Sequence, residues 1–161
     1  MSLCQRRQRL AMSLLLPLLV IGGTLTSRAQ TALLDGAKAD TLKIAFLHQL
    51  QRYANADVNT KIQLASRLGV STSDLAPVFA AARDFAAAER ALMMEAGAYR
   101  QRQQALSRPM ETRSVQEFAA RRFALARAAI DSLQTTLSPA SYAAFRRYLT
   151  SEFPKSVAFW R

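Results

Sequence analysis

The sequence predicts an all-α fold, built on an elongated antiparallel hairpin of two helices with shorter helices packed against it. Alanine is abundant, and no segment alternates apolar and polar residues with the two-residue period of a strand. Large apolar side chains recur every seven residues through the middle of the chain, at Val78, Phe85, Leu92, Tyr99 and Leu106. This period is typical of a helix that packs along its length against a partner helix.

The first 29 residues have the three-part layout of a secretory signal peptide. Three arginines precede an apolar stretch over residues 10–25, and the small residues Ser27 and Ala29 stand two apart before a polar residue. We therefore expect residues 1–29 to be a signal peptide cleaved near Ala29, which makes the mature protein periplasmic or secreted. The alternative is a retained membrane anchor, for which the apolar stretch is slightly short.

Cleavage at this site changes the chemistry available to the protein. Of the 161 residues, 132 remain, and the only cysteine, Cys4, is lost. This excludes disulfides, a thiolate nucleophile and a cysteine-ligated metal from the mature chain. Four arginines also leave, so the formal net charge of +11 falls to +7. The basic excess favours acidic proteins or anionic lipid head groups as partners, and nucleic acid is not expected for an exported chain.

The mature chain is expected to begin with a flexible leader over residues 30–39, followed by a single helical domain over residues 40–161. The first helix is predicted from Thr41 to Tyr53, with Asp40 as its N-cap. A second helix covers residues 57–68, and Asn55 or Asp57 is expected to start it. Gly69 follows it, where a left-handed residue commonly ends a helix. The inward side of this second helix is predicted to consist of Val58, Ile62, Ala65 and Leu68.

The long helix of the hairpin is predicted over residues 72–106, with Met93 on its packing seam and Gly97 as a bend or a site of close approach. Pro109 breaks the helix. Its partner covers residues 114–136 and starts at a capping box of Ser114 and Glu117. The residues of the partner helix that are expected to face inward are Val115, Phe118, Ala119, Ala126, Ala129, Ile130 and Leu133.

The last helix starts at a clear capping pattern. Ser138 is its N-cap, Pro139 takes the first helical position, and Leu137 closes over Tyr142 as a hydrophobic staple. Pro154 is expected to end this helix. A short aromatic tail follows, predicted either to fold back into a groove between helices or to anchor at an interface.

No pattern of catalytic or metal-ligating residues is present. His48 is the only histidine, and the sequence has neither a glycine-rich phosphate loop nor a serine nucleophile elbow. We therefore expect a protein that is not an enzyme and that holds no cofactor or metal. Glu89 and Glu95 are predicted to form ion pairs across the hairpin, Glu89 with Arg127 and Glu95 near Arg122.

Arginines crowd the predicted tip of the hairpin and the start of its second helix, and two more in the last helix are expected to add to the same basic surface. With the aromatic tail they form the candidate binding surface: Arg100, Arg102, Arg108, Arg113, Arg121, Arg122, Arg146, Arg147 and Trp160. Each arginine also has the simpler interpretation of a solvated charge that maintains solubility.

Two helix starts give the chain a resemblance to the Spy/CpxP periplasmic family, whose members carry paired LTxxQ motifs at helix starts. LSPAS places Leu137 and Ser138 at the leucine and hydroxyl positions, with Ser141 where the family has glutamine. In the earlier VSTSD, Ser71 and Asp74 stand at the hydroxyl and glutamine positions. The chain is also similar to exported helical proteins of unknown function.

The resemblance implies a helical cradle that acts as a chaperone or an envelope-stress adaptor. The leading hypothesis is a non-enzymatic periplasmic binding protein for protein clients or acidic envelope proteins. The alternatives are a peripheral protein on an anionic membrane surface and a purely structural or interaction protein; a homodimer is left open. A hairpin face covered by the other helices favours the structural role, and an open apolar face favours client binding.

Overall fold

The computed structural model describes residues 27–158, with side chains described for residues 35–156. The chain divides into two units, residues 1–33 and residues 34–161. Of the first unit, the structure describes residues 27–33, which are helical. The regular elements are α1 (Ser27–Tyr53), α2 (Val58–Leu68), α3 (Leu75–Ala105), α4 (Thr112–Thr136), α5 (Pro139–Arg147), a π-helical turn η1 (Tyr148–Glu152) and α6 (Phe153–Ala158).

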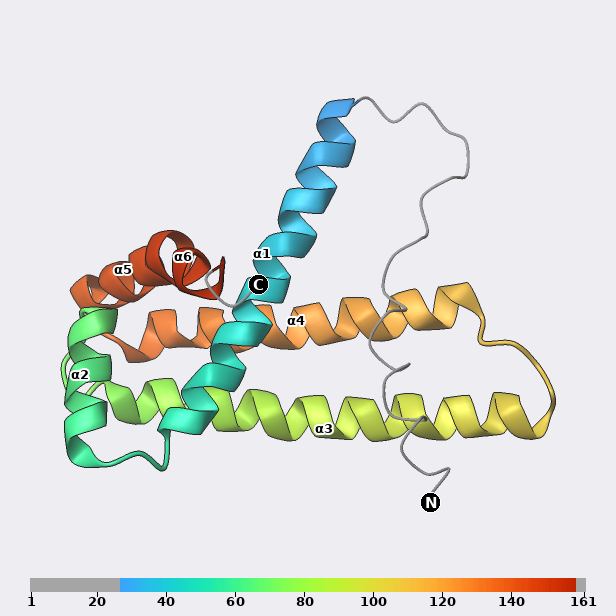
Figure 1. The fold of residues 1–161 in the computed structure, drawn as a ribbon, viewed down its shortest axis with the longest axis horizontal. Coiled ribbons are helices and arrows are strands. Elements are labelled where there is room, and N and C mark those ends of the chain that lie inside the picture. The colour runs from blue at the N-terminus through green and yellow to red at the C-terminus, as the bar shows by residue number, and fades with distance from the viewer. Residues whose placement is uncertain (1–26, 159–161) are drawn as a thin grey trace, which may run out of the picture. The chain divides into compact units, whose positions relative to one another are not determined.

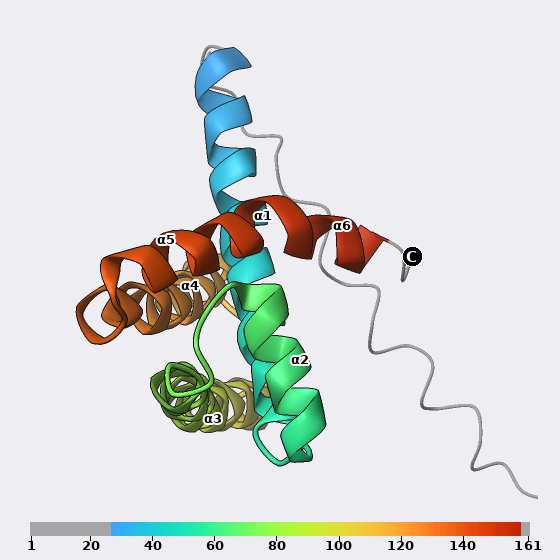
Figure 2. The same ribbon diagram turned by 90° about the vertical axis from the view of Figure 1, so that its left-hand side faces the viewer.

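The second unit is all-α, as predicted, and is built on an antiparallel hairpin of α3 and α4 (Figure 1). The other helices gather at one end of this hairpin. Figure 2, which looks along the hairpin, shows α2 beside it and α5 over α4. We call this covered end the base. It comprises α2, α5, η1, α6, the second-unit part of α1, and the stretches of α3 and α4 over residues 75–92 and 126–136.

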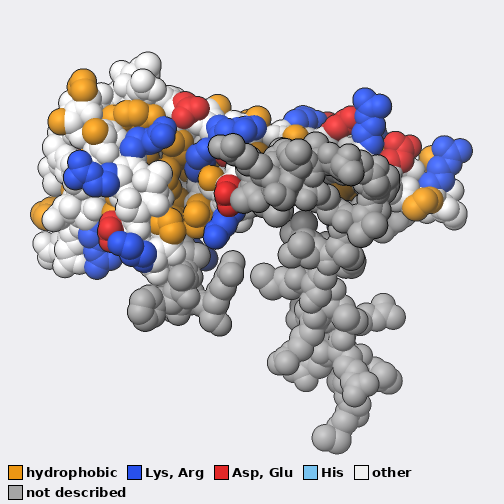
Figure 3. Space-filling view, turned by 90° about the horizontal axis from the view of Figure 1, so that it is seen from above, with side chains coloured by type: hydrophobic (Ala, Val, Ile, Leu, Met, Phe, Trp, Pro, Cys, Tyr) orange, Lys and Arg blue, Asp and Glu red, His pale blue; other side chains and the backbone are white. Residues whose placement is uncertain are grey.

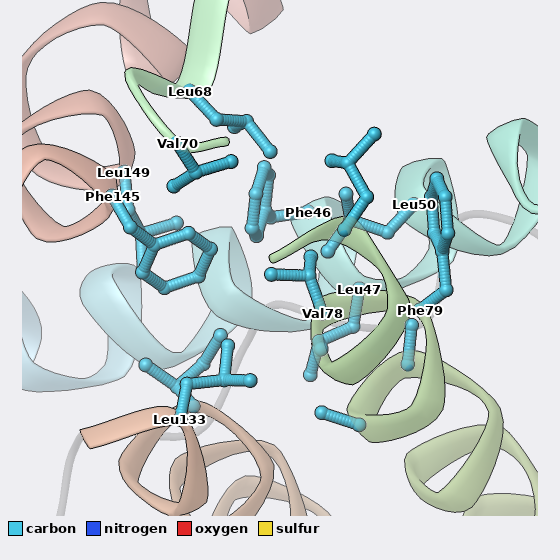
Figure 4. Close-up of a cluster of buried hydrophobic side chains, with 14 of the residues drawn as sticks. Phe46, Leu47, Leu50, Leu68, Val70, Val78, Phe79, Leu133, Phe145 and Leu149 are labelled. Carbon is cyan, nitrogen blue, oxygen red and sulfur yellow. The ribbon is translucent and has the colours of Figure 1, made fainter. Parts of the chain in front are cut away.

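The base holds one continuous apolar core. Phe46 of α1 lies at its centre, with its ring 5.5 Å from Phe145 of α5 and 5.0 Å from Phe153, both in edge-on geometry. Burial of this many large side chains supplies most of the stability of such a domain. The core side chains labelled in Figure 4 are Phe46, Leu47, Leu50, Leu68, Val70, Val78, Phe79, Leu133, Phe145 and Leu149.

Both ends of α2 form as predicted. The carboxylate of Asp57 accepts a hydrogen bond from the backbone N–H of Thr60 at 2.9 Å, which caps the first turn. Gly69 ends the helix with a φ of 67°, a conformation that L side chains rarely adopt. A Cβ at this position would lie 2.9 Å from the Cβ of Ala144, so α5 packs directly onto the glycine.

The two helix starts that carry the family resemblance are both capped, and they are joined to each other. Ser138 accepts a hydrogen bond from the N–H of Ser141, with Pro139 in the first turn of α5. Ser71 and Asp74 exchange two hydrogen bonds, each side chain accepting from the other's N–H. The Ser141 hydroxyl then donates to Asp74 at 2.8 Å, which ties the start of α5 to the start of α3.

Several predicted helix boundaries are wrong. α1 begins at Ser27, so residues 30–39 are helical and Asp40 lies inside the helix instead of capping it. α3 begins at Leu75, because residues 71–74 form the capped turn that precedes it. α4 begins at Thr112 with Glu111 as its N-cap, so the predicted capping box at Ser114 does not form.

The last helix does not end at Pro154, contrary to prediction. The chain passes through η1, where the N–H of Phe153 donates to the carbonyl of Tyr148, and then continues as α6. In an α-helix, the proline ring would collide with the carbonyl of the residue four positions earlier. The wider π-turn relieves this collision, and Pro154 therefore occupies the first turn of a new helical segment.

The predicted inward face of α2 is also wrong in part. Leu64, Ala65 and Leu68 are buried, whereas Val58 and Ile62 are 72% and 49% exposed. Helical spacing alone allowed either face. The face around Leu64 packs into the core of the base, where Leu64 lies beside Tyr53 of α1 and Tyr148 of η1. Val58 and Ile62 instead line a shallow surface hollow with Leu75 and Phe79.

Candidate functional site

The hairpin continues beyond the base as two helices with no third layer over their described residues. We call this part the arm and define it as residues 93–121. In α3, the last buried side chain is Leu92, and in α4 the first is Ala126. Four large apolar side chains of the arm are exposed: Met93 (46%), Met94 (76%), Leu106 (59%) and Val115 (46%).

This exposure corrects three predictions made from the spacing of apolar residues. Met93, Leu106 and Val115 were expected to pack inside the hairpin, and all three reach solvent. Two helices can bury only the narrow strip along which they touch, so apolar positions beside that strip stay exposed unless another helix covers them. Figure 3 shows apolar and basic side chains next to one another at the tip of the arm.

The inside of the arm is held by aromatic contacts. The rings of Tyr99 and Phe118 lie 6.0 Å apart, and the guanidinium of Arg121 lies 5.7 Å from the centre of the Phe118 ring. The hydroxyl of Tyr99 is buried and has no hydrogen-bond partner among the described residues. Gly97, expected to be a site of close approach, faces open space where a Cβ would stand.

An arginine–carboxylate pair fastens the two helices of the arm. Arg121 donates two hydrogen bonds to Glu95, at 2.7 and 2.6 Å. These bonds hold the pKa of Glu95 below its ordinary value and raise that of Arg121. Both side chains are about half exposed, so water and salt screen the pair.

A second, more buried ion pair lies where the arm meets the base. Glu89 is 7% exposed. It accepts from Arg122 of α4 at 2.6 Å and lies 3.1 Å from Nε2 of His48 of α1. The ring of His48 packs edge-on against Phe85. The cluster therefore joins three helices, and it gives the only histidine a structural contact that its position in the sequence did not reveal.

Ion pairing across the hairpin was predicted, but with the wrong partners. Glu89 pairs with Arg122 instead of Arg127, and Glu95 pairs with Arg121 instead of Arg122. Each arginine lies nearer the tip than expected. Because α4 begins two residues earlier than predicted, the register shifts, and the long arginine side chain spans the remaining offset.

Arg127 does not pair with Glu89 as predicted and instead lies near a carboxylate of the base. Its Nη1 lies 3.6 Å from Asp40, which also binds Lys43 at 3.0 Å. Asp40 is only 7% exposed, so this acid neutralises its two cationic neighbours within the base. Asp40 therefore forms an ion pair between α1 and α4 and does not cap a helix, contrary to the prediction from the sequence.

The candidate arginines fall into two separate groups. Six belong to the arm or its junction with the base, and of these Arg113, Arg121 and Arg122 are in ion pairs with Glu117, Glu95 and Glu89. The other three arm arginines, for which no ion pair is seen among the described residues, are Arg100, Arg102 and Arg108.

Arg146 and Arg147 do not join the basic surface of the arm, which corrects the prediction. They end α5, which lies over the base at the opposite end of the hairpin from the tip (Figure 1). α5 follows the C-terminal end of α4, and in an antiparallel hairpin that end is remote from the turn. Trp160 lies outside the described residues.

Within the part of the chain that the structure describes, no cluster of three or more acidic, histidine or cysteine side chains could hold a metal ion. Among the same residues, no helix has the length and apolar character needed to cross a membrane. Comparison with models of protein families, with curated proteins and with solved structures finds no match to this chain.

Proposed function

We propose that this protein is a non-enzymatic binding protein, chaperone-like or adaptor-like, that holds acidic, partly apolar segments of other proteins against its arm. The observation that carries the proposal is the exposure of Met93, Met94, Leu106 and Val115 on a two-helix arm, while the large apolar side chains of α3 and α4 in the base are buried. An apolar surface that the other described residues leave uncovered is typical of a surface that contacts a partner.

The side chains suit a client of variable sequence. Methionine is flexible and polarizable, so Met93 and Met94 can adapt to different apolar groups. These two residues also line a shallow hollow together with Glu89 and Arg90. Among the described residues this hollow is lined by α3 alone, so a client segment would lie along α3.

Charge selects among possible partners. The arm contains five arginines against three glutamates, a net charge of +2, and two of the glutamates are already in ion pairs. Arg100, Arg102 and Arg108 are thus available to carboxylates of a partner. A second copy of the arm would bring like charges together, so an acidic partner fits better than self-association.

Export from the cytoplasm is part of the same proposal and is inferred from the sequence alone. The basic, apolar and small-residue segments of residues 1–29 favour export, so the expected clients are unfolded or acidic proteins of the cell envelope. The resemblance to the Spy/CpxP family supports the same class of function.

An aggregation assay tests the proposal. The protein, freed of residues 1–29, is added to reduced α-lactalbumin, an acidic chain that aggregates when its disulfides are broken, and light scattering is followed. Suppression is expected with the wild type and should be largely lost in the double variant Met93→Gln/Met94→Gln. Val58→Gln is the matched control, because Val58 is about as exposed as Met94 but lies on α2 in the base.

A charge variant completes the assay. Arg100→Glu/Arg108→Glu should weaken suppression and reduce its dependence on salt, since neither arginine has an ion-pair partner to disturb among the described residues. Failure of the wild type to suppress aggregation, or equal loss in the Val58→Gln control, would count against a client-binding arm.

Docking on an anionic membrane is the second candidate, favoured by the exposed Leu106 beside Arg108 at the tip. Sedimentation with vesicles containing phosphatidylglycerol distinguishes the two. Binding to vesicles at low salt that is lost in Leu106→Gln, without any effect on α-lactalbumin, would favour the membrane.

A further inference from the structure

A partly enclosed cavity of about 190 Å³ lies in the base, away from the arm. Its walls come from α1, α4, the end of α5, η1 and the first turn of α6, and they combine apolar and cationic side chains. The lining residues are Ala39, Leu42, Lys43, Ile130, Arg146, Leu149, Thr150 and Pro154.

The π-helical turn shapes one wall of this cavity. Leu149 and Pro154 are five residues apart, a spacing that a π-turn places on the same face and an α-helix does not. Without η1, the side chains of these two residues would diverge. Single π-turns inside α-helices are frequent at functional sites, so this local departure from regular geometry is a second sign that the cavity has a use.

The charge around the cavity is positive. Lys43 and Arg146 line it, and Arg127 lies close by through its contact with Asp40. Asp40 is the only carboxylate paired with this group in the described structure, and it contacts Lys43 and Arg127 but not Arg146. Three cations against one acid leave a net charge of +2.

The side chain of Arg146 is positioned by its contact with Tyr142. Its guanidinium lies 5.9 Å from the centre of the Tyr142 ring, and its Nη1 is 3.4 Å from the Tyr142 hydroxyl. Stacking on an aromatic ring orients the planar guanidinium while leaving its other N–H groups free to bind a carboxylate in two places.

We propose that this cavity binds a small organic anion, a carboxylate with a short apolar tail. The tail would lie against Ile130 and Leu149, and the carboxylate would pair with Arg146 and Lys43. The volume of the cavity limits the ligand to a small molecule, since an apolar cavity of about 150 Å³ accommodates benzene. The site does not depend on the arm, so this proposal can be tested independently of the proposed client binding.

Calorimetric titration with hexanoate tests this site, with hexanamide as a neutral probe of the same shape. Hexanoate is expected to bind saturably and hexanamide much more weakly. Arg146→Gln should weaken hexanoate binding by about tenfold or more, because a charge-assisted hydrogen bond is lost. Arg147→Gln removes the neighbouring charge without touching the cavity lining and should leave the affinity within about twofold, as expected for an exposed charge.

A second variant distinguishes binding inside the cavity from binding to the cations on the surface. Ala39→Leu adds apolar volume at the lining and keeps every cation, so it should abolish hexanoate binding while the melting temperature stays near that of the wild type. Equal binding by Ala39→Leu and the wild type, or equal loss in the Arg146 and Arg147 variants, would overturn the proposal. Binding that appears only after deletion of residues 157–161 would also overturn it, and would assign the cavity to the chain's own aromatic tail.

Discussion

The base and the arm are two ends of one helical hairpin, but they are stabilised differently. In the base, α1, α2 and α5 cover the hairpin, and side chains such as Phe145 and Leu47 are completely buried. In the arm, an aromatic pair and a half-exposed ion pair hold the two helices together, and methionines face solvent. The base therefore supplies most of the stability, and the arm supplies a surface that the fold does not need for itself.

Because of this difference, we expect substitutions in the base to change mainly the stability of the protein and substitutions in the arm to change mainly binding. Burial contributes in proportion to the apolar area removed from water, whereas exposed ion pairs contribute little. We expect the arm to open locally more often than the base, as regions with few buried contacts do. The same substitution should therefore have unequal effects at the two ends of the hairpin.

The largest contrast is expected from removing one aromatic ring at each end. Phe145→Ala should lower the free energy of unfolding by about 3–5 kcal/mol, because the ring is fully buried among Phe46 and its neighbours. Phe118→Ala should cost about 1–2 kcal/mol, since that ring is only half buried. Urea unfolding followed by circular dichroism measures both, and equal losses would show that the arm is part of the core.

Replacing a glycine with alanine should change the stability in opposite directions in the two regions. Gly69→Ala is expected to destabilise the protein by about 2–3 kcal/mol, because alanine disfavours a positive φ and its Cβ would collide with Ala144. Gly97→Ala should stabilise it by up to about 1 kcal/mol, because its Cβ meets open space in a helix interior. Thermal melting checks the pair; a destabilising Gly97→Ala would reveal a contact at this position.

The two carboxylates that pair across the hairpin should differ in importance. Glu89→Gln should lower the free energy of unfolding by about 2 kcal/mol, because it weakens the contacts of a nearly buried carboxylate with Arg122 and His48. Glu95→Gln should have a much smaller effect, since Glu95 is half exposed. If added salt abolished the Glu89 effect as readily as the Glu95 effect, the junction would be as solvated as the arm.

A smaller effect is expected from the link between the two helix starts in the base. The hydrogen bonds from Ser141 and Ser71 hold the pKa of Asp74 below its ordinary value of 3.8. A lowered pKa stabilises the fold above pH 3.8, and this contribution is lost as the pH falls through the lower, folded-state pKa. Ser141→Ala should therefore reduce the melting temperature at neutral pH, and its difference from the wild type should shrink below pH 3.8. A difference independent of pH would mean that Ser141 acts through packing alone.

Short-range features of the fold could be predicted from the sequence because they depend on neighbouring residues. The cap at Asp57, the left-handed Gly69 and the start at Ser138 and Pro139 all follow from local backbone chemistry. The inward face of α2 and the passage of the chain through Pro154 could not be predicted, because packing of α2 into the core of the base decides the first and the π-turn decides the second.

The candidate site was predictable in its charges but not in its shape. The sequence identified the arginines of the arm, yet a seven-residue pattern does not say whether a third helix covers the hairpin. The helical spacing of apolar residues placed Met93 and Val115 inside the hairpin, and both are exposed. The sequence also joined Arg146 to the arm, although the direction of α4 places α5 over the base.

Client binding by the arm is tested most directly at the methionines themselves. With ¹³C-labelled methionine methyl groups in the protein freed of residues 1–29, the spectrum contains Met93, Met94 and Met110, which single substitutions can assign. On addition of reduced α-lactalbumin, the signals of Met93 and Met94 should shift or broaden, and the change should be lost in Arg100→Glu/Arg108→Glu. Binding of the client with both signals unchanged would contradict the account, because contact would then lie elsewhere on the molecule.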